Sequence, residues 1–422
     1  MNAPLPRRSA LALAWAMWGL GALFYCYGFF HRVSPSVMIG ELMRDFGIGA
    51  AALGNLAAIY FYAYAGLQIL VGLIFDRFGA RLPLVAACAL TAAGAGLFAV
   101  ATSIETAYAA RLAMGVGGAF TWVGALKLIA DGFPPQRFAL LSGLTLLLCL
   151  LGAVFGQAPL AALVAAYGWR ATSMGAGIFG VVLALALAVV VREQRSSAAQ
   201  HVPPPRAREG LRLVLGNPQS WVLALYGAGI TGPILAFGGL WGVPYLMAKH
   251  GLDRTHAASL TTIMLLGWGI GGPLTGWISD RLGKRRPPLI AGSLTVMASL
   301  LSTLYMPGLP VAAVGALLFI HGLASGTMVL IFAAAREHNR PETAGVAVGF
   351  VNTSGIGAAA ILQPLVGWLL DRLWVGGLSD GVRVYELGTY EAACAIIPVA
   401  VAGAIVAAFL IRETGCRNVH GG

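Results

Sequence analysis

Residues Gly72–Arg81 read GLIFDRFGAR and form a short polar stretch between two long apolar runs. A second copy, GWISDRLGKR, occupies Gly276–Arg285 and carries the same residue at six of the ten positions. The two copies are 204 residues apart in a chain of 422 residues. A repeat at this spacing predicts a protein built from two similar halves.

The composition excludes an ordinary water-soluble domain. Hydrophobic residues make up 58% of the chain and charged residues 10%, with a mean hydropathy of +0.80, whereas soluble domains carry about 25% charged residues. A membrane-spanning helix needs about 20 mostly apolar residues. Twelve segments meet this need and predict an all-α membrane protein: 10–33, 51–75, 82–103, 107–130, 138–165, 170–191, 219–246, 257–279, 288–306, 310–335, 343–370 and 390–411.

Positive charge is concentrated in the loops of one face. With a cytoplasmic N-terminus, 19 of the 27 Lys and Arg residues fall on the cytoplasmic side, which is the bias that orients membrane spans. The net charge of +11 therefore indicates topology and no nucleic-acid partner. Arg7-Arg8 precedes an apolar run without a small-residue cleavage site, so we expect a first span there. Both termini are expected in the cytoplasm, and the location is expected to be a bacterial inner membrane.

Residues 192–218 form the longest polar stretch, with five arginines and a Pro-Pro-Pro run. This composition predicts a cytoplasmic linker and not a packed element. The linker would divide an N-terminal six-helix bundle (1–191) from a C-terminal six-helix bundle (219–422). A second, shorter repeat also relates the two halves, because Gln157-Ala-Pro-Leu160 recurs as Gln363-Pro-Leu365.

Polar residues are distributed unevenly among the twelve segments. The apolar cores of the third, sixth, ninth and twelfth segments lack Asp, Glu, Lys, Arg, His, Asn and Gln. Because polar groups avoid hydrocarbon, these four helices are expected to face lipid and the other eight to enclose a path for a solute. The polar residues expected within the membrane are His31, Arg32, Asn55, Gln68, Arg111, Lys127, Gln157, His321, Asn352 and Gln363.

The doubled DRxGxR hinge, the six-plus-six spans and the long central loop resemble the major facilitator superfamily. Arg111-Leu-Ala-Met-Gly115-Val-Gly117 is similar to the fourth-helix arginine motif of that family, and Phe133–Arg137 and Gly168–Arg170 resemble the flanks of its fifth helix. The resemblance implies a secondary transporter that works by alternating access. Gly152–Leu160, GAVFGQAPL, has Gln-Ala where the family's antiporter motif has Gly-Pro, which disfavours drug-type antiport.

Arg32 interrupts an otherwise apolar first segment. A guanidinium binds a carboxylate through two parallel hydrogen bonds, and Arg32 resembles the first-helix arginine that meets the substrate carboxylate in organic-anion members. The alternative is that Arg32 snorkels to water at the outer interface. No Asp or Glu lies well inside a predicted span, so we expect the substrate to supply the negative charge.

Other candidates for substrate contact follow from spacing. Tyr60, Tyr64 and Gln68 lie on one helical face and would line the passage, unless Tyr60 belongs to the interfacial aromatic belt. His321, near mid-membrane, is either a proton carrier or ligand, or a packed core residue. The predicted substrate-contacting residues are Arg32, His31, Tyr60, Tyr64, Gln68, Gln157, Trp241, Trp268, His321, Asn352 and Gln363.

The repeated hinge predicts a gate. Asp76 and Asp280 lie at the unfavourable negative end of their own helices, so each is expected to find a cation or the N-terminus of another helix. The resemblance implies that both kinds of partner lie across the interface between the halves, where such pairs would latch the gate. Gly72 and Gly276 would allow close helix approach, and the hinge arginines would bind lipid phosphates. The alternative is a tight positive turn. The predicted gating residues are Gly72, Asp76, Arg77, Gly79, Arg81, Arg111, Lys127, Gly276, Asp280, Arg281, Gly283 and Arg285.

The leading hypothesis is a secondary active transporter for a small carboxylate-bearing solute, such as an organic anion, an amino acid or a small peptide. An anion entering a negative cell works against about 2.3 kcal/mol per charge per 100 mV, so proton symport or anion exchange is expected. The alternatives are an efflux antiporter of the same fold and a non-transporting membrane sensor or scaffold.

The remaining function classes lack sequence support. HExxH, a supported GxSxG and a phosphate-binding glycine loop are missing, which disfavours an enzyme. The five cysteines occur singly, so no metal site or disulfide is expected, and Met264, Met328 and His321 are too scattered for a copper importer. We expect no cofactor and a monomer whose partners are a small-molecule substrate, the lipid bilayer and, in the symport alternative, co-transported protons.

Overall fold

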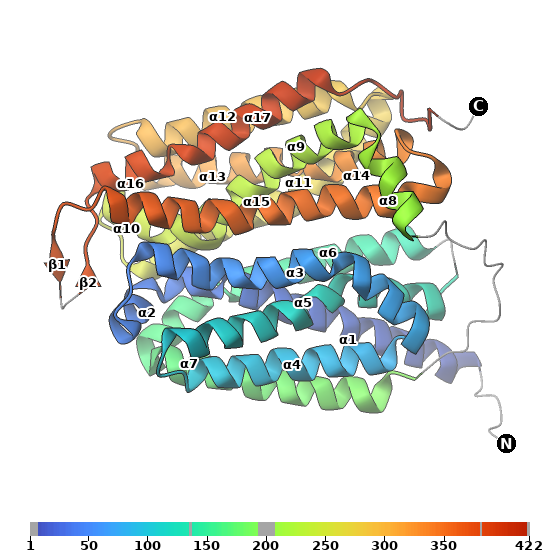
Figure 1. Ribbon diagram of the computed structural model, residues 1–422, viewed down its shortest axis with the longest axis horizontal. Helices are drawn as coiled ribbons and strands as arrows, with labels where there is room; N and C mark the ends of the chain where they lie inside the picture. The colour runs from blue at the N-terminus through green and yellow to red at the C-terminus, as the bar shows by residue number, and fades with distance from the viewer. Residues whose placement is uncertain (1–6, 135–136, 193–206, 380–381, 420–422) are drawn as a thin grey trace.

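The computed structural model describes residues 7–134, 137–192, 207–379 and 382–419, and its helices form two bundles side by side (Figure 1). The first half contains α1 (Arg7–Val33), the 3-10 turn η1 (Ser34–Val37), α2 (Ile39–Phe46), α3 (Ala50–Phe78), α4 (Arg81–Ala99), α5 (Ile104–Gly132), α6 (Phe138–Phe155) and α7 (Ala158–Val190).

The second half begins with α8 (Ala207–Leu215), α9 (Pro218–Ala236), the π-helix η3 (Phe237–Trp241), α10 (Gly242–His250), α11 (Arg254–Leu282) and α12 (Arg286–Tyr305). It continues with α13 (Val311–Ser325), α14 (Met328–Glu337), η4 (Pro341–Thr343), α15 (Ala344–Arg372), β1 (Leu378–Ser379), β2 (Val382–Arg383), α16 (Leu387–Cys394) and α17 (Ile396–Leu410). The two short strands pair antiparallel, with Leu378 opposite Arg383.

Eleven stretches of the described chain are long and apolar enough to cross a membrane. One of them, Leu140–Val190, has 51 residues, or about 76 Å of helix, while a bilayer core is about 30 Å thick. Gly168 inside it has a non-helical φ of 79° and ψ of 159°, so the stretch divides into two spans. The twelve predicted spans are thereby confirmed, with borders close to those expected.

Four predicted segments contain an interruption that hydropathy did not predict. The seventh contains the π-helix, the tenth breaks between α13 and α14, the twelfth breaks between α16 and α17, and the fifth breaks between α6 and α7. At the second break, a Cβ on Gly326 would collide with the backbone of Gly271 and Gly272. The interruption therefore lets α13 and α14 pack backbone to backbone against α11, which hydropathy alone cannot reveal.

The predicted linker is partly structured. Residues 193–206 lie outside the described part of the chain, but Ala207–Leu215 form α8, which packs against α9, α15 and η4. Val214 is fully buried in that contact. The end of the stretch therefore belongs to the second half, because its few apolar residues fall on one side of a short helix.

The four helices predicted to face lipid lie at the edges of the molecule (Figure 1). In the first half α4 packs against α7 and α5, and in the second half α12 and α17 pack against each other and against α13 and α9. These helices expose large apolar side chains, including Leu82, Val182, Leu294 and Val406. The edge positions agree with the uneven distribution of polar residues, and the solute path itself remains a prediction.

The two ends of the spans form two faces. We call the end that carries both hinges and both ends of the described chain the hinge face, and the opposite end, with β1 and β2, the hairpin face (Figure 1). Among the described residues, the hydrogen bonds and ion pairs between the halves all lie toward the hairpin face; they involve Glu41, Ala50, Ala51 and Gln157 of the first half. The halves are closed together at the hairpin face.

The seam between the halves opens toward the hinge face. Near the hairpin face, Gly54 of α3 packs so tightly that a Cβ would overlap the backbone of Gln363 and Pro364 of α15. Gly72 lies 18 residues further along α3, which is about five turns and so the same helical face. A Cβ on Gly72 would meet nothing within 4 Å. Helices α3 and α15 are therefore no longer in contact at that position.

The same pattern holds on the partner helix and on a second pair. Gly345 lies 18 residues before Gln363 on α15 and has open space, as do Gly143 of α6 and Gly276 of α11. Toward the middle of that second pair, Gly269 packs tightly against Leu150. The conformation is therefore open toward the hinge face, and the close approach predicted for Gly72 and Gly276 is absent from it.

Candidate substrate-binding site

Arg32 lies in the last turn of α1, where a cation interacts favourably with the negative end of the helix. Its residue exposure is only 4%. The side chain is therefore enclosed, and the alternative that it snorkels to water at the membrane surface is wrong for this conformation.

Four rings surround the Arg32 guanidinium, and we call them the aromatic cage: Phe29, Tyr60, Phe61 and Tyr64. Its Cζ lies 4.6 Å from the ring centroid of Phe29, 4.7 Å from Tyr64, 5.8 Å from Tyr60 and 5.9 Å from Phe61. Such cation–π contacts partly offset the loss of water around a buried guanidinium.

The aromatic cage does not satisfy all the hydrogen-bond donors of Arg32. Its Nε is buried without a hydrogen-bond partner, and the described residues place no carboxylate in an ion pair with it. A buried charge without an opposite charge is costly. The site is thus prepared for an anion that brings its own acceptor oxygens.

The tyrosines of the cage are fixed by α1 and α5. Tyr60 donates its hydroxyl to the Gly28 carbonyl at 2.9 Å, and a side chain on Gly118 would overlap that hydroxyl. The Tyr60 and Tyr64 rings stack with centroids 6.4 Å apart. Both are buried, so Tyr60 does not belong to an interfacial belt, whereas Gln68 donates to the Tyr64 carbonyl at 3.4 Å.

The second half reaches the cage through Trp268. This half-buried side chain of α11 lies with its ring centroid 6.2 Å from that of Phe29. The cage therefore lies at the interface of the halves, which is where transporters built from repeats bind their substrates.

Phe29 and Phe61 were missed by the sequence reasoning. Both belong to an apolar helix, and nothing in composition separates a cage ring from a core ring. The available signal was position, because Phe29 lies three residues before Arg32 on the same helical face and Phe61 follows Tyr60.

Gln157, Gln363 and Trp241 gather instead around the π-helix η3. Gln157 Nε2 donates to the Gly238 carbonyl at 2.9 Å, Gln363 Nε2 donates to the Leu235 carbonyl at 3.0 Å, and Trp241 Nε1 donates to the Gln363 carbonyl at 2.9 Å. The hydroxyl groups of Ser36 and Thr261 also donate to Gln157. These three predicted residues stabilise the interruption and are not brought to the cage.

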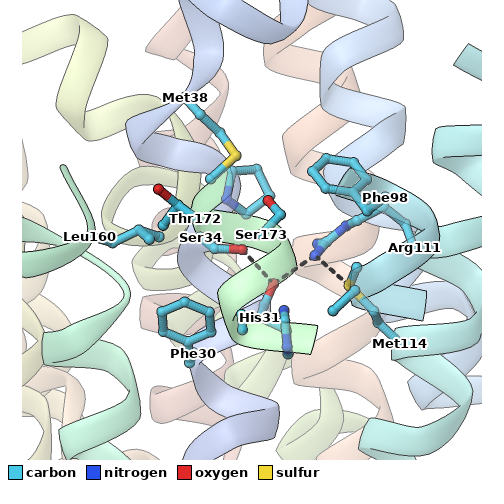
Figure 2. Close-up of a pocket in the computed structure, with 13 residues that line it drawn as sticks. Phe30, His31, Ser34, Met38, Phe98, Arg111, Met114, Leu160, Thr172 and Ser173 are labelled. Atoms are coloured by element: carbon cyan, nitrogen blue, oxygen red, sulfur yellow. Dashed lines mark hydrogen bonds between the residues drawn. The ribbon is translucent and has the colours of Figure 1, made fainter. Parts of the chain in front are cut away.

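Arg111 on α5 connects this helix to α1 and α3 through hydrogen bonds. It is 1% exposed, so it is not an interfacial residue in this conformation, and it donates to the carbonyls of Leu56 at 3.2 Å, Ala57 at 3.2 Å and His31 at 2.6 Å. Figure 2 shows the guanidinium directed at the His31 carbonyl oxygen. The His31 ring packs 4.5 Å from that of Tyr27, and His31 and Arg111 line a small pocket to which no cage ring contributes. Arg111 Cζ nevertheless lies 5.2 Å from the ring centroid of Tyr60, so this cage ring lies close to both guanidinium groups.

His321 and Asn352 are also apart from Arg32. His321 Nδ1 lies 3.4 Å from the Ser299 hydroxyl of α12, so its ring faces an edge helix. Asn352 is half-buried on α15. Of the eleven residues predicted to contact substrate, the structure unites Arg32, Tyr60, Tyr64 and Trp268.

The second hinge is a charged cluster within its own half. Arg285 donates to Asp280 at 2.8 Å and to Glu337 at 2.8 Å. Asp280 thus pairs locally and not across the interface, and the buried Arg285 does not reach lipid phosphates. Burial opposes the charged form, but the hydrogen bonds to Glu337 and Asp280 outweigh it and raise the pKa of Arg285.

The remaining hinge residues form turns and helix ends. Gly79 and Gly283 have positive φ angles of 73° and 60°, which only glycine adopts easily. Arg81 donates to the Ala188 carbonyl at the end of α7 at 2.7 Å. Exposed Arg77 lies over the Phe78 ring, Arg281 lies over Trp277, and Lys127 pairs with Asp131 at 3.2 Å. The side chain of Asp76 lies outside the described part of the structure.

The comparison with protein families agrees with this architecture. The model of the Major Facilitator Superfamily matches residues 17–364. This chain belongs to the major facilitator superfamily. As a member it is a multi-pass membrane transporter and not an enzyme.

Curated relatives of this superfamily member are distant but nearly full-length. The gentisate transporter of Corynebacterium glutamicum is 25% identical over 89% of this chain and 85% of its own. The hexuronate transporter of Bacillus subtilis is 23% identical, with 82% and 88% covered. The membrane sensor protein UhpC of Salmonella typhimurium is 26% identical, with 88% and 87% covered.

Solved structures confirm the superfamily fold. A bacterial homologue of the lysosomal transporter Spinster, described as inward-facing and unoccupied, superimposes with a TM-score of 0.75 at 18% identity and covers 94% of this chain and 97% of that one. The nucleoside transporter NupG gives a TM-score of 0.74 at 13% identity, with 94% and 98% covered.

Proposed function

We propose that this protein moves a small carboxylate-bearing solute across the membrane by alternating access, with Arg32 as its charged contact. The observation that carries the proposal is the burial of Arg32 inside the aromatic cage without an acidic partner among the described residues. A bound carboxylate would complete the hydrogen bonding of the guanidinium. The position of the cage between the halves supports contact with a transported solute.

The cage also narrows the substrate. Four rings offer flat apolar surface, and the Tyr64 hydroxyl adds a polar group, while the Tyr60 hydroxyl already donates to the Gly28 carbonyl. This lining suits an organic anion with a planar or apolar body near its carboxylate. Gentisate and hexuronate, which name two relatives, are both carboxylates. We include amino acids and small peptides in the class to be tested.

The setting of transport is part of the proposal. The charge bias supports a cytoplasmic hinge face in a bacterial inner membrane, and a monomer provides both halves of the site. Transport of an anion would be coupled to protons or to the exchange of a second anion.

The proposal is tested with Arg32→Gln, Arg32→Lys and the exposed control Arg336→Gln. Purified protein is melted with a panel of aromatic acids, sugar acids, amino acids and dipeptides, and uptake of the best stabiliser is then measured in proteoliposomes. We expect uptake by Arg32→Gln to fall on the order of 100-fold, because a charge-assisted bidentate contact is lost. Arg32→Lys should retain part of the activity, and Arg336→Gln should match the parent.

Equal transport by Arg32→Gln and the parent would refute the role of Arg32. The relatives named membrane sensor protein UhpC, at 26% and 25% identity, favour one second candidate, a sensor with the same fold. Melting that is stabilised by a carboxylate without any measurable flux would support that candidate.

A further inference from the structure

Residues Gly367–Leu373, GWLLDRL, repeat Gly276–Leu282, GWISDRL, at five of seven positions. Each segment ends a helix of 29 residues, α15 and α11 respectively. The two ends lie on opposite faces of the molecule, since α15 ends at the hairpin face and α11 at the hinge face (Figure 1). This third segment keeps the Gly, Asp and first Arg of the hinge but has Trp374 and Gly376 where DRxGxR has Gly and Arg. It is a partial copy on the other face, and the gate predicted from the first two copies does not explain it.

Asp371 of this third copy binds the beginning of a helix in the other half. Its carboxylate accepts hydrogen bonds from the backbone N–H groups of Ala50 at 3.1 Å and Ala51 at 2.8 Å. These N–H groups begin α3 and have no acceptor within their own helix. The residue before them, Gly49, has no side chain with which to cap them. Asp371 therefore acts as an N-cap supplied by the opposite half, reinforced by the helix dipole.

Two neighbours hold the Asp371 carboxylate in place. Tyr385 donates its hydroxyl at 2.5 Å and Arg383 donates a guanidinium N–H at 2.9 Å, both to Oδ1. The Tyr385 hydroxyl also accepts from the Ala50 N–H at 3.2 Å. A Cβ on Gly49 would lie 2.6–2.9 Å from the carboxylate atoms, so only glycine leaves room for the contact. The surroundings are thus arranged around this carboxylate.

We propose that Gly367–Leu373 is a third hinge working on the hairpin face and that Asp371 is its latch. As a positioning residue, Asp371 sets the fraction of molecules whose halves are closed at the hairpin face. The inference rests on alternating access, which the superfamily provides, and does not depend on Arg32 or on any particular substrate.

The chemistry of this contact suits a latch that opens in each cycle. Its acceptor is a carboxylate and its donors are backbone groups at a helix end, and water can replace both partners when the halves separate. The other cross-half contacts described are the Glu41–Arg254 ion pair at 2.5 Å and the hydrogen bonds of Gln157. Loss of Asp371 should therefore weaken the seam without abolishing it.

The test measures the hairpin-face opening without any substrate. Spin labels at the exposed positions Arg44→Cys and Met306→Cys, one in each half, report the distance between the halves in full-length protein lacking its five native cysteines. In Asp371→Ala we expect the ratio of open to closed distances to rise on the order of tenfold, as for a lost N-cap. Asp371→Asn keeps one acceptor oxygen and should shift less.

Matched variants distinguish the loss of the Asp371 contact from a general destabilisation of the fold. Tyr385→Phe keeps the carboxylate but removes its donor, so it should shift the ratio in the same direction by a smaller factor. The exposed neighbour Glu386→Ala should leave the distances unchanged. Parent-like distances in both Asp371→Asn and Tyr385→Phe would overturn the proposal even if Asp371→Ala failed to fold, and so would an equal shift in Glu386→Ala. Because no ligand is present, failure of the carboxylate proposal would not affect the result.

Discussion

Arg32 and Arg111 are both buried guanidinium groups of the first half, yet their surroundings differ. Arg111 donates to three backbone carbonyls that join α5 to α1 and α3, whereas Arg32 has rings around it and an unpaired Nε. A buried charge that makes its hydrogen bonds contributes to the fold, while one that lacks them is retained at a cost. Their replacement by an apolar residue should therefore have opposite effects.

We expect Arg32→Met to melt at or above the temperature of the ligand-free parent, because removal of an uncompensated charge is neutral or stabilising. Arg111→Met should destabilise the protein by about 3 kcal/mol, since α5 loses its links to two helices. The measurement is thermal melting of both variants in the same detergent without ligand. Similar losses of stability in the two variants would mean that Arg32 is structural.

For single residues, the sequence identified which side chains inside the membrane are charged, but it did not identify the side chains that surround them. Arg32 was identifiable because a cation within an apolar membrane helix is energetically costly and usually has a function. Its cage depends on the packing of α1 against α3, so Phe29 and Phe61 could not be distinguished from other aromatic residues. His31, adjacent in sequence, lines a separate pocket because successive residues point about 100° apart around a helix.

Helices α3 and α15 illustrate how glycines serve two conformations. Gly54 is packed against α15 now, and Gly72, on the same face of α3, has open space. Gly72→Leu should therefore melt like the parent yet lower transport at least about tenfold, because a closed hinge face would have to accommodate the added side chain. Gly54→Leu should destabilise the present conformation.

Gly66 provides the control for this comparison. It is also open, but it is exposed and lies about a third of a turn away from the face shared by Gly54 and Gly72. Gly66→Leu should transport normally in the same proteoliposome assay. A parent-like rate for Gly72→Leu would show that α3 does not approach α15 at the hinge face.

The start of α12 gives a pH-dependent prediction. Glu413 accepts hydrogen bonds from the N–H groups of Arg285 at 2.9 Å and Arg286 at 2.8 Å. Partial burial opposes its charge, but these and other backbone hydrogen bonds lower the pKa of Glu413 below its ordinary value of 4.5. A lowered pKa means that the stabilisation is complete above pH 4.5 and disappears as the pH falls through the folded-state pKa.

We therefore expect Glu413→Gln to melt about 2 °C below the parent at pH 7. The gap should close as the pH is lowered beneath 4.5, because the parent then loses the same charge. Melting curves of the two proteins across this range are the measurement. A gap that is independent of pH would contradict an electrostatic cap at α12.

Element borders followed from hydropathy, but interruptions did not. The start of α11 at Arg254 and the end of α15 at Arg372 lie within three residues of the predicted segments. The π-helix at Phe237–Trp241 depends on the side-chain amides of Gln157 and Gln363, which lie outside it and donate to the carbonyls of Gly238 and Leu235. Such tertiary compensation has no signature in local sequence.

For the whole molecule, the repeat predicted two halves, and the family match agrees with it. The partners of the hinge carboxylates could not be predicted from the sequence, because these partners change between the conformations of the transport cycle and the structure shows one conformation. Asp280 pairs with Arg285 of its own half while the hinge face is open, and Asp371 makes the cross-half contact on the other face. Which latch is engaged depends on the conformation of the seam.

Charge balance across the whole molecule gives the last prediction. Without a co-ion, a membrane potential of 100 mV opposes entry of a monovalent anion by about 2.3 kcal/mol, or about 50-fold in concentration. Among the described residues, the ring contacts of His31 are with Tyr27 and Phe30, and His321 Nδ1 lies 3.4 Å from the Ser299 hydroxyl, so neither histidine is directed at the aromatic cage. We therefore expect His31→Gln and His321→Gln to retain uptake, and proteoliposomes preloaded with the same anion to exceed empty ones at least about tenfold. Accumulation driven by a pH gradient alone, and lost in either variant, would instead make that histidine the proton carrier.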